Sequence, residues 1–117
     1  MDAMLRRGST RFRPATIIDV GASTGSWSMM AKSHWPNAQL VCIEADERHR
    51  EKLEAFCASS GAKCWFAMAD QRDGIGNFLA SPTDPFGGCG STVPAGNVIW
   101  IDCRRPMRPL RTSSAMR

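Results

Sequence analysis

The sequence predicts an α/β fold built on a parallel sheet, and three observations support this class. Two short apolar runs, at 14–20 and 39–44, are each followed by a segment with helical periodicity. A tight turn from Gly21 to Gly25 joins the first run to the first helical segment. The connections are short, and strands that alternate with helices form parallel sheets through right-handed crossovers.

The first two thirds of the chain alternate strands and helices. We expect strands at 14–20, 39–44 and 63–68, and helices at 26–34 and 47–60. The β-branched run in the first strand is typical of a central parallel strand, because such strands are buried on both faces. In each helix, apolar residues recur three or four positions apart and define one buried face.

Both helices carry recognisable end signals. Pro36 follows the first helix and cannot continue it. Asp46 is suited to cap the second helix, and Gly61 to end it in a left-handed conformation. The expected buried faces are Trp27, Met30, Ala31 and His34 in the first helix, and Leu53, Phe56, Cys57 and Ser60 in the second.

The sequence changes in character after Met68. A turn is expected at 70–74, a short strand at 75–80, a loop rich in Gly, Pro and Ser at 81–96, and another strand at 97–102. The prediction is therefore the N-terminal half of a Rossmann-like parallel sheet, ordered 3-2-1 plus a fourth strand, as an incomplete three-layer α/β/α arrangement. Three regions follow: a basic arm (1–13), a partial domain (14–103) and a disordered basic tail (104–117).

Charge is divided unevenly along the 117 residues, which are enough for one domain. Residues 14–103 hold six Lys or Arg against ten acids, whereas the two ends hold nine Arg against one acid. A solvated end is favoured over a nucleic-acid or lipid contact. No apolar run reaches the roughly 18–20 residues that span a bilayer, so we expect no membrane partner and a cytoplasmic location.

Cysteine and histidine give no sign of a metal or a nucleophile. The five Cys are odd in number and contain no C-x-x-C pair, which favours reduced core thiols. His34 and His49 are the only histidines, and both are expected at the surface or at helix ends. A zinc site is not expected, because the ligand spacing is missing.

The glycine turn is the main candidate for a ligand site. Its G-x-x-x-G spacing lacks the third glycine of the dinucleotide fingerprint and the Lys-Ser/Thr pair of a P-loop. Asp19, two residues before Gly21, disfavours a pyrophosphate and favours an ammonium group. A ligand with a cationic amino-acid end and a nucleoside end, such as S-adenosylmethionine, fits better than NAD or ATP.

Acids at the ends of the strands complete the candidate site. Glu44, 19 residues after Gly25, stands where an acid accepts ribose hydroxyls; the alternative is a solvated acid at a strand end. Ala45 is placed to support the ribose or adenine. Asp70 is placed to reach the adenine amino group, or is simply a turn residue, and Asp19 could also cap the glycine turn.

Four segments resemble the FkbM family of S-adenosylmethionine-dependent methyltransferases: 17–25, 42–46, 69–74 and 87–91. The resemblance covers roughly residues 16–92. It implies a Rossmann-like sheet, S-adenosylmethionine as methyl donor, and O-methylation of a hydroxyl on a sugar, glycan or small molecule. No catalytic residue or metal ligand is assigned, and the residues expected to bind the cofactor are Asp19, Gly21, Ala22, Gly25, Glu44, Ala45 and Asp70.

The resemblance ends near the last strand. Val98 to Asp102 is similar to the family's I-K-I-D-V-x-G strand, but Cys103 and Arg104 follow in place of the glycine and glutamate. We therefore expect a truncated or frame-shifted chain that lacks the acceptor pocket and the catalytic base. The alternative is a non-catalytic nucleotide- or partner-binding module, with an oligomer covering the open sheet edge.

Overall fold

Three parallel strands form the sheet that carries the glycine turn. They are β1 (Thr16–Val20), β2 (Gln39–Glu44) and β3 (Lys63–Phe66), hydrogen-bonded in the order β1-β2-β3. The predicted strand order is therefore confirmed. The computed structural model describes residues 2–70, 73–91 and 97–101.

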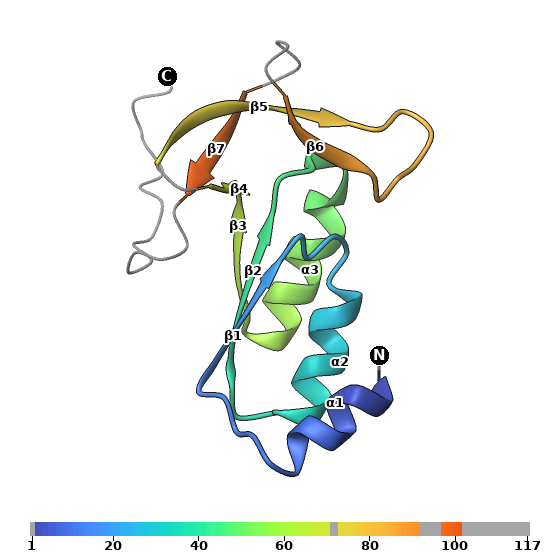
Figure 1. Cartoon of the computed structure of the whole chain (residues 1–117), viewed down its shortest axis with the longest axis vertical. Helices are drawn as coiled ribbons and strands as arrows, with labels where there is room; N and C mark the ends of the chain where they lie inside the picture. Colours follow the sequence, from blue (N-terminus) through green and yellow to red (C-terminus); the bar gives the residue numbers. More distant parts are fainter. Residues whose placement is uncertain (1, 71–72, 92–96, 102–117) are drawn as a thin grey trace.

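The two long helices cover the same face of this sheet. α2 (Ser26–His34) and α3 (Arg50–Ser60) lie side by side on it, and the 3₁₀ turn η1 (Glu47–His49) precedes α3 (Figure 1). Two right-handed crossovers that step in the same direction along a sheet place their helices on one face. The described residues therefore form two layers here, and the expected three-layer arrangement was wrong for them.

The central strand is buried on both faces, whereas the first strand is not. Leu40 and Cys42 of β2 pack against Leu53 and Cys57 of α3 on the helix face. On the other face of β2, Val41 and Ile43 pack with Ala67 and Trp65. β1 is an edge strand of the described sheet, with Ile18 44% and Val20 55% exposed, so its prediction as a central strand was wrong.

Small residues, rather than large apolar ones, bring α2 close to the sheet. Ser28 and Ala31 are fully buried, while Met29 is 60% exposed. The predicted face of this helix held Ala31 but missed Ser28, because a serine gives no hydrophobic signal. For α3, Leu53 and Cys57 are buried as predicted, and Gly61 ends the helix with a φ of 74°.

The basic arm begins with a helix that packs against α2. α1 (Asp2–Ser9) buries Leu5, and Nε2 of His34 lies 2.8 Å from Oδ1 of Asp2. The indole of Trp35 donates a hydrogen bond to the carbonyl of Phe12 at 2.7 Å. Residues 2–12 are thus attached to the C-terminal end of α2 (Figure 1).

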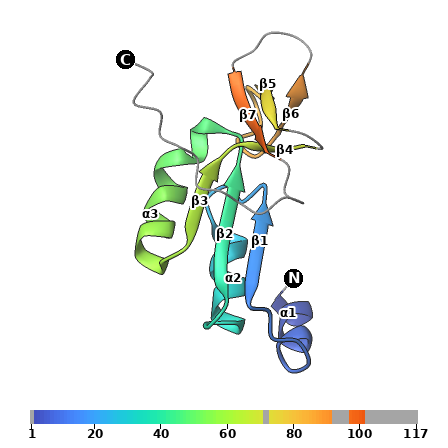
Figure 2. The same cartoon turned by 90° about the vertical axis from the view of Figure 1, so that its left-hand side faces the viewer.

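A second, mixed sheet stands at the carboxyl end of the parallel strands. It contains β4 (Met68–Ala69), β5 (Gly74–Ala80), β6 (Gly88–Ser91) and β7 (Asn97–Ile101), in the order β4-β7-β5-β6 (Figure 2). The predicted strand at 63–68 is therefore divided between two sheets, at Ala67.

Two further predictions for this region need correction. The expected fourth strand is β7, but it pairs with β4 and β5 and does not extend the parallel sheet. The predicted loop at 81–96 contains a strand, β6, which pairs with β5. Gly88 leaves space for a side chain of β5, because a Cβ on Gly88 would stand 2.8 Å from Cε1 of Phe78. Residues 71–72, Cys103 and the predicted tail at 104–117 lie outside the described residues.

Candidate functional site

The glycine turn folds over the end of the neighbouring strand. Gly21, Ser23 and Gly25 have φ values of 79°, 52° and 88°, in the left-handed region. The backbone N–H groups of Gly21 and Ala22 both donate to the carbonyl of Ile43, at 2.8 and 3.1 Å. These bonds hold the turn beside Glu44, the last residue of β2.

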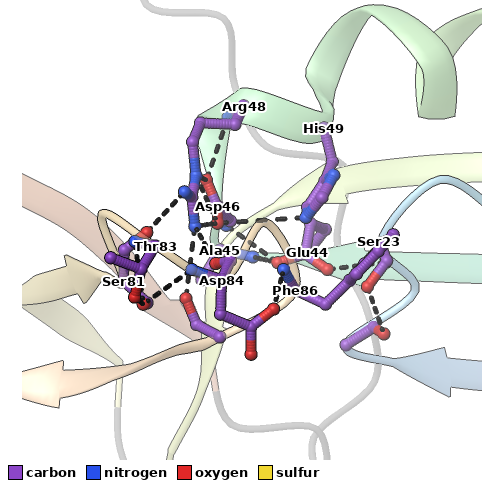
Figure 3. Close-up of polar contacts among 12 residues, drawn as sticks. Ser23, Glu44, Ala45, Asp46, Arg48, His49, Ser81, Thr83, Asp84 and Phe86 are labelled. Carbon is purple, nitrogen blue, oxygen red and sulfur yellow. Dashed lines mark hydrogen bonds and ion pairs between the residues drawn. The ribbon is translucent and has the colours of Figure 1, made fainter.

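The carboxylate of Glu44 is bound to the glycine turn. Its Oε2 accepts a hydrogen bond from the N–H of Ser23 at 2.6 Å, and its Oε1 accepts from Ala45 and Asp46, both at 2.8 Å (Figure 3). A carboxylate offers about four acceptor positions, so one position on Oε2 remains after these three bonds. The bond to Ser23 also helps to hold that residue in its left-handed conformation, which costs about 1–2 kcal/mol for a residue other than glycine.

A cavity of about 300 Å³ opens beside this carboxylate. One wall consists of the ends of β1 and β2, with Gly21, Ser23 and Glu44. The opposite wall comes from Phe78 of β5 and the segment 86–90, which runs from the loop into β6. The carboxyl end of the parallel sheet and the β5–β6 hairpin thus enclose one small-molecule site.

The structure brings three of the seven predicted cofactor residues to this cavity, namely Gly21, Glu44 and Ala45. Ala22 is 5% exposed and belongs to the core beneath the turn. Asp70 follows β4, is half-buried, and does not line the cavity. The remaining two, Asp19 and Gly25, have other contacts.

Asp19 interacts with the helix beneath the turn. The hydroxyl of Ser28 donates to its Oδ2, which directs the carboxylate toward α2. Burial raises the pKa of Asp19, the Ser28 bond opposes this rise, and the nearby Glu44 carboxylate adds to it. The structure does not place Asp19 on the cavity wall, where an ammonium group would need it.

Gly25 is required for packing. A Cβ at this position would lie 2.7 Å from Cδ1 of Phe56 and 3.4 Å from Cδ1 of Leu53, both on α3. Gly25 therefore allows α3 to approach the start of α2. By contrast, a Cβ on Gly21 would meet no atom within 4 Å, and this glycine lies open to the cavity.

An aspartate and an arginine connect the end of β2 to the β5–β6 loop. Asp46 is 4% exposed and caps η1, the 3₁₀ turn that forms the start of the helix predicted at 47–60, by accepting from the N–H of Arg48 at 3.0 Å; the N-cap of α3 itself is His49. The guanidinium of Arg48 also binds both oxygens of this carboxylate, which lowers the pKa of Asp46. The same guanidinium donates to three loop carbonyls, those of Ser81 at 2.6 Å, Asp84 at 3.3 Å and Gly87 at 3.2 Å.

His49 lies at a helix end, between η1 and α3, which is one of the two predicted positions, but it is buried in the site and not at the surface. It is 6% exposed, lines the cavity, and stacks on Phe86 with ring centroids 5.5 Å apart and an interplanar angle of 12°. Its Nε2 lies 3.9 Å from Oδ2 of Asp46. No pattern in the sequence connects His49 with Phe86, because their contact depends on the loop folding back over η1.

The cavity wall is acidic. Its titratable residues are Glu44, Asp46, His49 and Cys89, and no Lys or Arg is among the described residues that line it. Arg48 and Arg50 flank the lining residue His49 in the sequence, and both guanidinium groups are already bound, that of Arg48 to Asp46 and the loop and that of Arg50 to Glu47 and Glu54. The wall thus suits a neutral or cationic ligand better than a phosphate.

Cysteines and histidines form no metal centre in the described part of the chain. Cys42 and Cys57 are buried free thiols, Cys64 is half-buried and Cys89 is exposed. Among the described residues, no three His, Cys, Asp or Glu side chains are grouped so that they could hold a metal ion. Within the same residues, no helix combines the length and apolarity that crossing a membrane requires.

The chain was compared with protein-family models, with curated proteins and with solved structures, and none of the three comparisons found a match. Evidence for its function therefore comes from its own residues and their geometry.

Proposed function

We propose that this chain is the donor-binding part of an S-adenosylmethionine-dependent methyltransferase of the FkbM type. The observation that carries the proposal is the position of Glu44. Its carboxylate is held against the glycine turn by Ser23 and stands in the wall of a cavity without Lys or Arg among its described lining residues.

Three features of the cavity support this donor, and the second and third of them favour it over NAD or ATP. The free acceptor position on Glu44 suits a ribose hydroxyl, and a charge-assisted bond of this kind contributes about 1.5–3 kcal/mol. The acidic wall favours a ligand that carries a sulfonium and an ammonium. The described lining residues include Gly21 and Ser23 but not Ser26, where α2 begins, so a phosphate would not reach the helix N-terminus that binds it in dinucleotide sites.

The chemistry would divide between this chain and groups outside the site. When bound, the donor would supply an electrophilic methyl group for transfer to an acceptor hydroxyl. In this chain, Glu44 would orient the ribose, and the backbone of the glycine turn would fix the donor's position. The β5–β6 hairpin would limit the access of water. We assign no catalytic base, and a cavity of about 300 Å³ is small for a donor and an acceptor together.

Calorimetric titration with S-adenosylhomocysteine tests this proposal. We expect binding to the unmodified chain, weaker or absent binding of NAD and ATP, and at least tenfold weaker binding to Glu44→Gln. Glu54→Gln is the matched control, because Glu54 is an exposed acid of α3 that pairs with Arg50 outside the cavity. The proposal is wrong if Glu44→Gln, folded by circular dichroism, binds as tightly as Glu54→Gln.

One observation favours a second function, a non-catalytic binding module. Three backbone N–H groups already donate to the carboxylate of Glu44 and give it a structural role, because they connect the glycine turn to the segment before η1. Equal or tighter binding of ATP or NAD in the same titrations would support this alternative.

A further inference from the structure

We propose that Arg48 is a positioning residue that fixes the Ser81–Gly87 loop, so that Phe86 and Gly87 stay in the wall of the cavity. A bound ligand is then enclosed only while Arg48 holds this loop. The loop closes the β5–β6 hairpin, and the wall residues Phe86 and Gly87 belong to it. The ligand-binding part of this inference uses the proposed donor, whereas the positioning part requires no ligand.

The first argument is the geometry of the guanidinium. One edge, with Nε and Nη2, binds the carboxylate of Asp46, which is itself nearly fully buried. The remaining N–H groups donate to the carbonyls of Ser81, Asp84 and Gly87. Arginine suits this arrangement because its five donors diverge from one rigid plane, whereas the ammonium of lysine is a single point (Figure 3).

The second argument is that the loop folds around these same three residues. The N–H of Ser81 donates to the carbonyl of Gly87 at 2.8 Å, and the N–H of Gly87 donates to the carbonyl of Asp84 at 3.2 Å. The hydroxyl of Ser81 accepts from the N–H of Asp84 at 3.0 Å. Arg48 therefore binds the loop at the positions that define its shape.

The third argument concerns what this contact holds in place. Phe86 stacks on His49, and both rings line the cavity, but Phe86 is still 67% exposed. A ring that is mostly in solvent gains little from burial and needs another contact to stay docked. Arg48 itself is not among the lining residues, so its effect on a ligand would pass through the loop.

Arg48→Lys is the informative variant. It retains a positive charge beside the buried Asp46, so it avoids leaving that carboxylate unpaired, but it loses the simultaneous contacts with the loop carbonyls. Arg50→Lys is the matched control, because Arg50 pairs with Glu47 and Glu54 and contacts neither the loop nor the cavity. Phe86→Leu is a second variant in case Arg48→Lys does not fold. It replaces an exposed ring and so removes the stack of Phe86 on His49.

Hydrogen exchange of the full chain, followed by mass spectrometry, tests the positioning role. We expect Arg48→Lys to speed exchange in peptides covering residues 81–87 by about tenfold and to leave peptides from α3 unchanged. Phe86→Leu should act in the same direction, and Arg50→Lys should not. Equal loop exchange in Arg48→Lys and Arg50→Lys would overturn the proposal, as would equal acceleration in the loop and in α3.

Adding S-adenosylhomocysteine tests the ligand-binding part. We expect slower loop exchange in the unmodified chain and about tenfold weaker binding to Arg48→Lys, although this residue does not touch the cavity. Unchanged affinity in Arg48→Lys would contradict the coupling. If the unmodified chain does not bind this probe, the proposed donor is wrong, and loop exchange without ligand still decides the role of Arg48.

Discussion

Replacing Gly25 with alanine tests whether this glycine serves packing, as the structure indicates, or ligand binding, as the sequence suggested. The new Cβ would stand 2.7 Å from Cδ1 and 3.0 Å from Cγ of Phe56, distances that require α3 or this ring to move. Overpacking of a core costs about 1–3 kcal/mol. The backbone φ of 88° adds about 1–2 kcal/mol for a residue other than glycine, so we expect a loss of about 2–5 kcal/mol.

Gly61→Ala separates the two contributions. Gly61 has a similar φ, 74°, but a Cβ there would meet no atom within 4 Å, so only the conformational cost remains. Urea denaturation should therefore show Gly25→Ala to be less stable than Gly61→Ala by about 1–3 kcal/mol. Adding Phe56→Ala to Gly25→Ala should reduce the penalty, because the two residues are in contact. Equal stabilities of the two glycine variants would refute the packing role.

Two further predictions concern charge. Burial raises the pKa of Asp19, so the unfolded carboxyl ionises before the folded one and the chain loses stability as the pH rises from about 4 to the folded pKa. Asp19→Asn avoids this loss, and its amide oxygen can still accept from Ser28. In thermal melts, the stability of Asp19→Asn relative to the unmodified chain should therefore grow over this pH range and then level off. A difference in stability that does not change with pH would contradict this. Hydrogen bonds from His34 and Arg6 lower the pKa of Asp2, so the attachment of α1 should weaken as the pH falls through that pKa, and Asp2→Asn should weaken it at neutral pH. Trypsin should then cleave after Arg7 faster in Asp2→Asn, and an unchanged cleavage rate would show that α1 does not depend on this pair.

Local patterns in the sequence were sufficient for the parallel sheet. β2 and α2 have the predicted bounds, and Gly61 ends α3 in the predicted left-handed conformation. These features depend on periodicity, β-branched residues and cap chemistry, all of which act within a few residues. The order of the three strands followed from the short connections.

Features that depend on contacts distant in sequence could not be predicted. β6 lies in a Gly-rich stretch with low strand propensity, and its pairing with β5 comes from backbone bonds and from space for Phe78. Placing His49 in the site required the β5–β6 loop to fold back over η1.

The candidate site divides in the same way. The sequence placed Glu44 and Gly21 correctly at the end of the sheet, because parallel strands bring their carboxyl ends to one edge. It did not distinguish Gly25, which faces α3, from Gly21, which faces the cavity, because spacing alone does not show which glycine a neighbour approaches. The opposite wall, with Phe78 and Phe86, was not predicted at all.

The most direct test of the proposed site is an amide NMR titration with S-adenosylhomocysteine. The N–H groups of Ser23, Ala45 and Asp46 all donate to the Glu44 carboxylate, so a ligand hydroxyl that binds this group should perturb all three. We predict that these amides shift the most, together with Gly21, while the amides of α1 stay unchanged. Shifts confined to residues 2–13, or no shifts at a ligand concentration that saturates ordinary donor sites, would contradict a donor site at Glu44.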